Sequence, residues 1–151
     1  QTKKGQQWYF GMKAHIGVDS ATKLVHTVLA SAANVADKDA LPYLLHGNET
    51  RVWGDSAYQG QTAVIHARAP NASDCTNRRC RYKDIVDEIE KAKNRSKSQV
   101  RAKVEHVFGV VKGVFGFRKV RYRGLDKNLN RLEVTCALAN LFMVRRQLLK
   151  T

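Results

Sequence analysis

The residues of this chain best suited to chemistry are two carboxylates, Asp55 and Glu105, set among many cations. Glu105 is the only acid between Lys91 and Arg123, a stretch that holds eleven Lys and Arg. A single carboxylate in such a basic field is suited to hold a divalent metal ion against a phosphate backbone. The alternative is an ordinary ladder of ion pairs on a helix, worth about 0.3–0.5 kcal/mol per pair.

The segment around Glu105 has the pattern of a long amphipathic helix. Its apolar side chains recur at helical spacing: Val100, Val104, Val107, Phe108, Val111 and Phe115. At about 100° per residue, with Val100 at zero, Arg101, Glu105 and Lys112 fall at about 100°, 140° and 120°. The three charged side chains are therefore expected on one face, at the flank of the apolar stripe.

Asp55 ends a short predicted strand, and sites in α/β proteins collect outside the carboxyl ends of strands. Its alternative role is to cap the turn that follows. Together with Glu105 it would supply carboxylates from different elements, as phosphoryl transfer on DNA with two Mg²⁺ ions requires. Lys13 and His15 share one face of another predicted strand, where contact with DNA and a role in the sheet surface are both open.

The charge of the chain is unevenly distributed. Its 151 residues carry a formal net charge of +14, and 43% of them are apolar, as in one folded domain. Residues 1–75 hold 7 basic and 6 acidic side chains, whereas residues 76–151 hold 20 and 7. Such a basic half predicts a polyanionic partner, most often nucleic acid, with a soluble basic protein such as a ribosomal one as the alternative. No apolar run has the length of a membrane span, so a cytosolic protein with reduced cysteines is expected.

The elements that must position these residues follow from periodicity and turn signals. We expect an α/β layout with mixed strand directions, and residues 68–83 leave room for one further strand. The predicted elements are strands Trp8–Val18 and Leu24–Ser31 around the turn Asp19–Lys23, a helix Asp37–Gly47, a strand Arg51–Asp55, a helix Gln61–Ala67, a helix from Asp84 whose end Gly113 and Gly116 mark, a basic connector Arg118–Arg123 and a helix Leu129–Leu149.

Several motifs, taken in order, are similar to those of one known family. Arg101, Glu105 and Lys112 have the spacing of the Arg–Glu–Lys helix motif of bacterial insertion-sequence transposases of the DDE class. The segment Trp53–Tyr58 resembles their second-aspartate strand. Three further segments resemble the subgroup typified by insertion sequence five: Gly11–His15, Asn34–Asp37, and Arg121–Leu125 with Asn128.

This resemblance implies a ribonuclease H-like mixed sheet flanked by helices. It also implies Mg²⁺-dependent (or Mn²⁺-dependent) cleavage of transposon-end DNA and strand transfer by the freed 3′-OH. Asp55 and Glu105 would be the second and third metal-binding acids. The implied partners are double-stranded DNA, as transposon ends and target, and a second copy of the chain on that DNA, in the bacterial cytoplasm at the nucleoid. The implied DNA contacts are Lys13, His15, Arg101, Lys112, Arg118, Lys119, Arg121 and Arg123.

The chain departs from the family pattern at two points. Ser98 stands where the motif usually has Tyr, three residues before Arg101. The first aspartate normally lies on a central strand upstream of Gly11–His15, and residues 1–7 contain no acid. We therefore expect residues 1–151 to be the C-terminal part of one catalytic domain, without its first, central strand. We expect such a piece to be catalytically inactive, and either unstable or forced to pair the strands around Phe10 and Trp53 directly.

Two other functions are compatible with the same residues. In a non-catalytic DNA-binding domain, the basic stretch would grip phosphates and Glu105 would be a salt-bridge partner. A ribonuclease H-like nuclease of repair or resolution would share the metal site.

Overall fold

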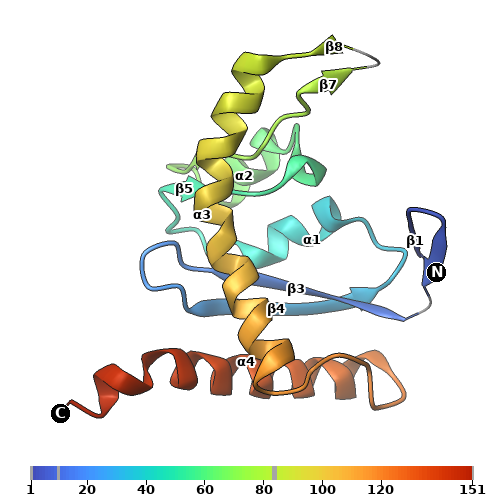
Figure 1. The fold of residues 1–151 in the computed structure, drawn as a ribbon, viewed down its shortest axis with the longest axis vertical. Coiled ribbons are helices and arrows are strands. Elements are labelled where there is room, and N and C mark those ends of the chain that lie inside the picture. Colours follow the sequence, from blue (N-terminus) through green and yellow to red (C-terminus); the bar gives the residue numbers. More distant parts are fainter. Residues whose placement is uncertain (1, 10, 83–84, 151) are drawn as a thin grey trace. The chain divides into compact units, whose positions relative to one another are not determined.

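The computed structural model describes residues 2–9, 11–82 and 85–150 (Figure 1). The chain divides into two compact units, one formed by Gln1–Ala36 with Val104–Thr151 and the other by Asp37–Lys103. The chain contains both helices and strands, which confirms a mixed α/β layout. The boundary between the units falls inside the longest helix, α3, which runs from Glu88 to Gly113.

The first unit is built on an antiparallel hairpin of β3 (Met12–Val18) and β4 (Val25–Ala32), as the alternating pattern predicts. The turn between them is closed by Asp19, whose Oδ1 accepts hydrogen bonds from the backbone of Ala21 and Thr22 and from the Thr22 hydroxyl. Lys23 takes a left-handed backbone conformation with φ of 65°. The predicted turn is therefore confirmed.

The prediction of one continuous strand from Trp8 to Val18 is wrong. Residues before Gly11 form a separate hairpin of β1 (Thr2–Lys4) and β2 (Gln7–Tyr9), with Gly5 at a φ of 62° in its turn. Gly11 itself has a φ of 149°, a conformation that only glycine adopts easily, and this interrupts the strand. Phe10, within the predicted strand, lies outside the described residues.

Two helical segments pack on the β3–β4 hairpin in this unit. One is the C-terminal part of α3, which ends at Gly113, the first of the two glycines predicted to mark its end. The other is α4 (Leu125–Leu148), which packs against β4 and begins one turn earlier than the predicted Leu129. Residues 114–124 between them form no described helix or strand, which confirms an irregular basic connector.

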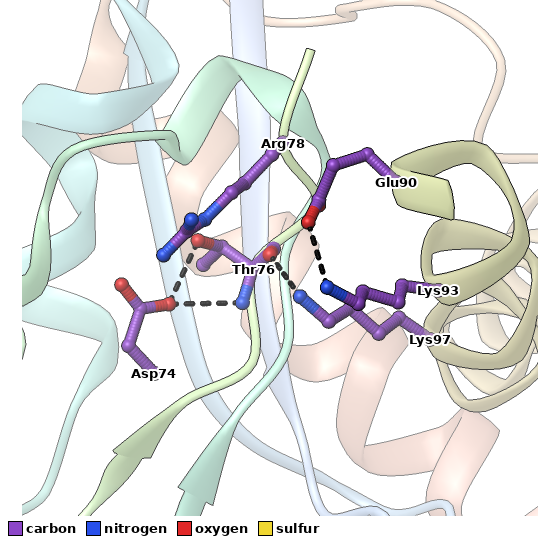
Figure 2. A pocket seen from close by; sticks show the side chains of 6 residues that line it. All are labelled: Asp74, Thr76, Arg78, Glu90, Lys93 and Lys97. Atoms are coloured by element: carbon purple, nitrogen blue, oxygen red, sulfur yellow. Dashed lines mark hydrogen bonds and ion pairs between the residues drawn. The ribbon is translucent and has the colours of Figure 1, made fainter. Parts of the chain in front are cut away.

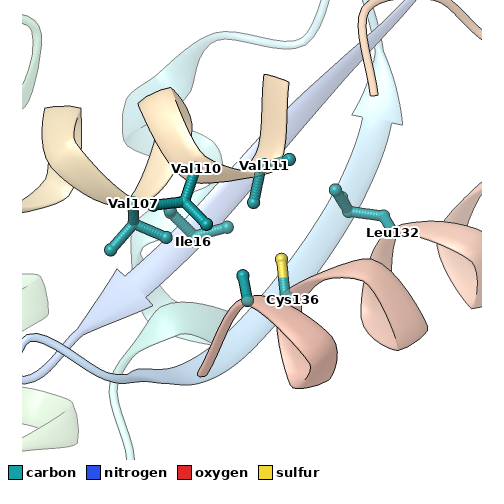
Figure 3. Packing of buried hydrophobic residues seen from close by; sticks show 7 residues of the cluster. Ile16, Val107, Val110, Val111, Leu132 and Cys136 are labelled. Atoms are coloured by element: carbon teal, nitrogen blue, oxygen red, sulfur yellow. The ribbon is translucent and has the colours of Figure 1, made fainter. Parts of the chain in front are cut away.

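The core of the first unit lies where α3, α4 and β3 meet (Figure 3). Val107 and Val111 of the predicted stripe are buried, whereas Val104, Phe108 and Phe115 are only partly buried at its edge. Val110, which the predicted stripe omitted, is buried as well because the helix contacts neighbours over a wider arc. The buried side chains are Ile16, Val107, Val110, Val111, Leu132, Cys136 and Ala139.

The second unit contains short elements around a smaller core of Leu41, Val52, Ile65, Ala69 and Ala72. The predicted helices and the strand at Arg51 are confirmed with shifted ends, and residues 68–83 contain short strands. The predicted helix start at Asp84 lies outside the described residues, and α3 begins at Glu88. The elements are α1 (Asp37–Leu44), β5 (Arg51–Val52), the 3₁₀ helix η1 (Ser56–Tyr58), α2 (Thr62–Arg68), β6 (Ser73–Asp74), β7 (Arg81–Tyr82), β8 (Ile85–Val86) and the N-terminal part of α3.

The strands of the described residues form four separate two-stranded sheets. The β5–β6 pair is parallel and the other three pairs are antiparallel, so both strand directions occur, although in no single larger sheet. Among the described residues β3 pairs with β4 and β5 pairs with β6, so the alternative in which the strands near Phe10 and Trp53 pair directly is not observed. No helix in residues 2–9, 11–82 and 85–150 is both long enough and apolar enough for a membrane span.

We predict that the three cysteines differ sharply in reactivity, although all three are free thiols. Cys136 is 2% exposed in the first core, and burial raises the pKa of its thiol to about 11. Because the thiolate is the reactive form, a chromogenic disulfide reagent should titrate Cys75 and Cys80 in the folded protein and Cys136 only after unfolding. In the Cys136→Ala variant, the thiol that reacts only after unfolding should be absent, which identifies it as Cys136. Equally fast reaction of all three thiols in the folded protein would contradict the burial of Cys136 in this core.

Candidate active site

Asp55 lies at the end of an extended parallel pairing in the second unit. Backbone hydrogen bonds join Ser73 N to Thr50 O at 2.9 Å, Cys75 N to Val52 O at 2.8 Å and Asn77 N to Gly54 O at 2.9 Å. The two segments therefore run side by side beyond the two-residue strands β5 and β6. Asp55 is the first residue after this pairing, which is the position expected for a site residue at a strand end.

The carboxylate of Asp55 has one oxygen that is used within the fold. Its Oδ1 accepts a hydrogen bond from Ala57 N at 2.8 Å and caps η1. Among the described residues, no group bonds to Oδ2, and the residue is half-buried. The capping role considered for Asp55 is therefore real, and it leaves the second oxygen available to a ligand.

Tyr58 is a neighbour of Asp55 that sequence reasoning did not single out. Burial, with smaller contributions from the negative charges of Asp37 and Asp55, raises the pKa of the Tyr58 hydroxyl to about 12. Its ring packs over Gly54, where an added Cβ would lie 2.8 Å from the Tyr58 Cδ2 atom. The Gly–Asp–x–x–Tyr spacing is the sequence signal for this packing, because a residue four positions on can fold back over the glycine.

Asn77, the next residue alongside this strand end, carries an unusual side chain. It is 8% exposed, and its Nδ2 donates to Ser98 Oγ at 3.2 Å. Its Oδ1 is buried and has no hydrogen-bond partner among the described residues. A buried acceptor without a partner costs about 1–3 kcal/mol, so this oxygen is a candidate ligand atom beside Gly54 and Asp55.

Glu105 and its charged neighbours lie on α3 as predicted. Glu105 and Lys112 are exposed, and Arg101 is half-buried. The Lys112 ammonium lies 5.3 Å from the centre of the Phe108 ring, one turn earlier in the helix. Arg101 belongs to the second unit and Glu105 to the first, and α3 continues unbroken through both positions.

Lys13 and His15 both make hydrogen bonds inside the first unit. Lys13 Nζ donates to the backbone oxygen of Val35 at 2.8 Å. His15 is 6% exposed, and its Nε2 lies 2.7 Å from the Ser31 hydroxyl on the neighbouring strand. These contacts give both side chains a role in the hairpin, and their contact with DNA stays a prediction.

The basic connector carries Arg118, Lys119, Arg121 and Arg123 as exposed side chains. Its backbone is held by Asn128 of α4, which is 3% exposed. The Asn128 Oδ1 accepts from Arg121 N at 3.2 Å and Tyr122 N at 3.3 Å, and its Nδ2 donates to Tyr122 O at 2.6 Å and Gly124 O at 2.7 Å. Arg131 Nη1 adds a bond to Lys119 O at 3.0 Å. The connector is therefore fixed by its backbone, and its cations remain at the surface.

Asp55 and Glu105 belong to different units, and each is placed within its own unit only. Within the described parts of the chain, no three His, Cys, Asp or Glu side chains come together as a metal site. The sequence model of the transposase DDE domain family matches residues 1–141. The chain belongs to this family. Family membership makes it a transposase domain, whose general activity is DNA transposition with cleavage of DNA. No solved structure matches the chain.

We predict that Gly54→Ala destabilises the transposase domain by about 1–3 kcal/mol, because the new Cβ forces the Tyr58 ring out of its place. The matched control is Gly109→Ala in α3, where nothing lies within 4 Å of the added Cβ. That change should stabilise by about 0.5–1 kcal/mol, since alanine favours a helix interior. Denaturant unfolding measures both, and equal effects of the two changes would show that Tyr58 does not pack as described.

We predict that Asn128→Ala costs about 1–3 kcal/mol of folding stability, because it leaves backbone groups of the connector without partners. Asn130→Ala on the same helix is the control, since Asn130 is exposed and its replacement should change the folding stability little. Thermal unfolding measures the difference. A similar melting temperature for the two variants would contradict the role of Asn128.

Proposed function

We propose that this chain takes part in divalent-metal-dependent cleavage and strand transfer of insertion-sequence end DNA, with Asp55 and Glu105 as metal-binding acids. The observation that carries the proposal is the family match over residues 1–141, which includes both carboxylates. The location of Asp55 at a strand end and the exposure of Glu105 on a basic helix support it.

The donor atoms on this chain suit Mg²⁺ or Mn²⁺, which prefer oxygen ligands. Asp55 offers its Oδ2, Asn77 offers a buried Oδ1 without a described partner, and Glu105 offers an exposed carboxylate. When bound, such ions stabilise the attacking and leaving oxygens of an in-line displacement at phosphorus.

The remaining charged residues would bind and orient DNA. Arg101 and Lys112 flank Glu105 along α3 and would hold phosphates near the reacting bond. The exposed connector cations, Arg118, Lys119, Arg121 and Arg123, would grip the backbone further away, and Lys13 and His15 complete the proposed set. The partners we propose are double-stranded transposon ends and target DNA, with two copies of the chain on the DNA, because strand transfer joins two ends.

Within the transposase family, we propose the subgroup typified by insertion sequence five and a place in the C-terminal part of a ribonuclease H-like catalytic domain. The motifs Gly11–His15, Asn34–Asp37 and Arg121–Leu125 support the subgroup. On this proposal the 151 residues alone are inactive, because residues 1–7 contain no acid that could serve as a first aspartate. The full reading frame is therefore the form to assay.

One observation favours a second function, a non-catalytic DNA-binding domain. The Asp55 Oδ1 caps η1, so this carboxylate has a structural role that needs no metal. In that case the basic residues bind DNA and the two acids are dispensable for it.

We predict that Asp55→Asn and Glu105→Gln each lower Mg²⁺-dependent cleavage of the element's own ends about a thousand-fold, while DNA binding survives. Loss of a metal-binding charge removes several kcal/mol of transition-state stabilisation, and each 1.36 kcal/mol is about tenfold in rate. The assay uses the full reading frame, with the 151-residue chain beside it.

The control is His106→Gln, which changes an exposed residue next to Glu105 that points about 100° away on the helix. It should cleave like the wild type. If cleavage persists after either acid is replaced, the acids are structural and the second function holds.

A further inference from the structure

The loop that follows β6 is fastened to α3 through its backbone. Asn94 of α3 accepts from Arg78 N at 3.1 Å and donates to Arg78 O at 2.6 Å. Lys97 Nζ donates to Thr76 O at 2.9 Å, and on the other side Arg79 N donates to Gln59 Oε1 at 2.9 Å. Each of these contacts lies inside the second unit, so the path of the loop is fixed there.

This fastening uses main-chain atoms and leaves the arginine side chains of the loop at the surface. Arg78, Arg79 and Arg81 are all exposed. Among the described residues, none of the three guanidinium groups has a hydrogen-bond or ion-pair partner. Because the backbone of this loop is already ordered, binding an anion would cost the side-chain freedom of these arginines but little backbone freedom.

A pocket of about 220 Å³ lies between this loop and α3, lined by Asp74, Thr76, Arg78, Glu90, Lys93 and Lys97 (Figure 2). The two acids of the pocket, Asp74 and Glu90, already have ion-pair or hydrogen-bond partners within the fold. Glu90 pairs with Lys93 at 3.1 Å. Asp74 accepts from Thr62 Oγ1 at 2.6 Å and from Thr76 N and Oγ1. Burial of Asp74 opposes its ionisation, but these hydrogen bonds and the charge of Lys97 outweigh burial and hold the pKa of the carboxyl below its usual range.

The adjoining part of α3 presents further cations, and of its large apolar side chains Ile89 is exposed. The buried residues of this helix are Val107, Val110 and Val111, all near its C-terminal end. Between Arg78 and Lys103 the sequence holds ten Lys and Arg and four Asp and Glu. This excess of positive charge favours an anionic partner for the surface.

We propose that Arg78 and Arg79, with Lys97 and Arg81 beside them, form a second contact with the phosphate backbone of duplex DNA, separate from Asp55 and Glu105. Arginine suits this role because its planar guanidinium donates two parallel hydrogen bonds to phosphate oxygens. Asn94 is the positioning residue, since it holds Arg78 without touching the DNA. The inference rests on the proposed function only in taking DNA as the partner.

The test is the salt dependence of duplex DNA binding by the full 151-residue chain carrying Arg78→Gln and Arg79→Gln together. Each phosphate contact adds about 0.9 to the slope of log affinity against log salt concentration, so the slope should fall by about 1.8. The control is Arg51→Gln with Arg68→Gln, which removes two exposed arginines of the same unit. The Arg78 and Arg79 variant should lose the same affinity for two duplexes of equal length and unrelated sequence, because contacts with the phosphate backbone carry no sequence information.

Asn94→Ala provides a second test because it changes no charge. It should weaken binding several-fold while circular dichroism shows the same helix content as the wild type. The inference is overturned if the Arg78 and Arg79 variant binds DNA like the control pair, or if the loss appears on one duplex only. In that case the wild type still binds DNA and the cleavage test of Asp55 and Glu105 still stands. If the wild type itself shows no salt-dependent binding, the proposed function fails together with this inference.

Discussion

The interaction on which much of this structure depends is a hydrogen-bonded pairing between an asparagine amide on a helix and the backbone of a neighbouring segment. Asn94 pairs with the N–H and C=O of Arg78, and Asn140 pairs in the same way with Val25 at 2.9 and 2.8 Å. Asn128 bonds to three residues of the basic connector. An amide offers an acceptor and a donor in one plane, so it can satisfy both backbone groups of one residue, either in a loop, as at Arg78, or at the start of a strand, as at Val25.

The chain has two small hydrophobic cores and many exposed cations. These pairings explain how the backbone that carries the cations is held in place. The buried clusters around Val107 and around Ile65 fix the helices and the hairpin. The two cation-bearing segments, at Arg78 and at Arg121, lie outside the clusters and have few apolar side chains of their own. Hydrogen bonds from helices that the cores do fix replace the missing apolar contacts. These asparagine bonds hold backbone atoms only, so the charged ends of the side chains stay at the surface, where Arg118 Nε also donates to Lys112 O at 3.4 Å.

The sequence predicts those parts of the fold that depend on local patterns. Alternation and a turn acid predict the β3–β4 hairpin, helical spacing predicts most of the buried face of α3, and the glycines at 113 and 116 predict its end. The break at Gly11 and the strands of two residues are set by backbone conformation and by distant partners, so periodicity does not reveal them. For the site, the strand-end location of Asp55 was predictable. The packing of Tyr58 and the asparagine pairings were not, since a single Asn in a helix has the same appearance in sequence whether or not it finds a backbone to bind.

The two-stranded sheets have a consequence for the behaviour of the protein in solution. Among the described residues, every strand has one edge without a strand partner, and such edges are places where chains associate into aggregates. A net charge of +14 keeps the molecules apart by mutual repulsion. That repulsion acts over about 10 Å at 0.1 M salt and about 3 Å at 1 M. The high salt that releases a basic protein from nucleic acid during purification therefore also removes its protection against self-association.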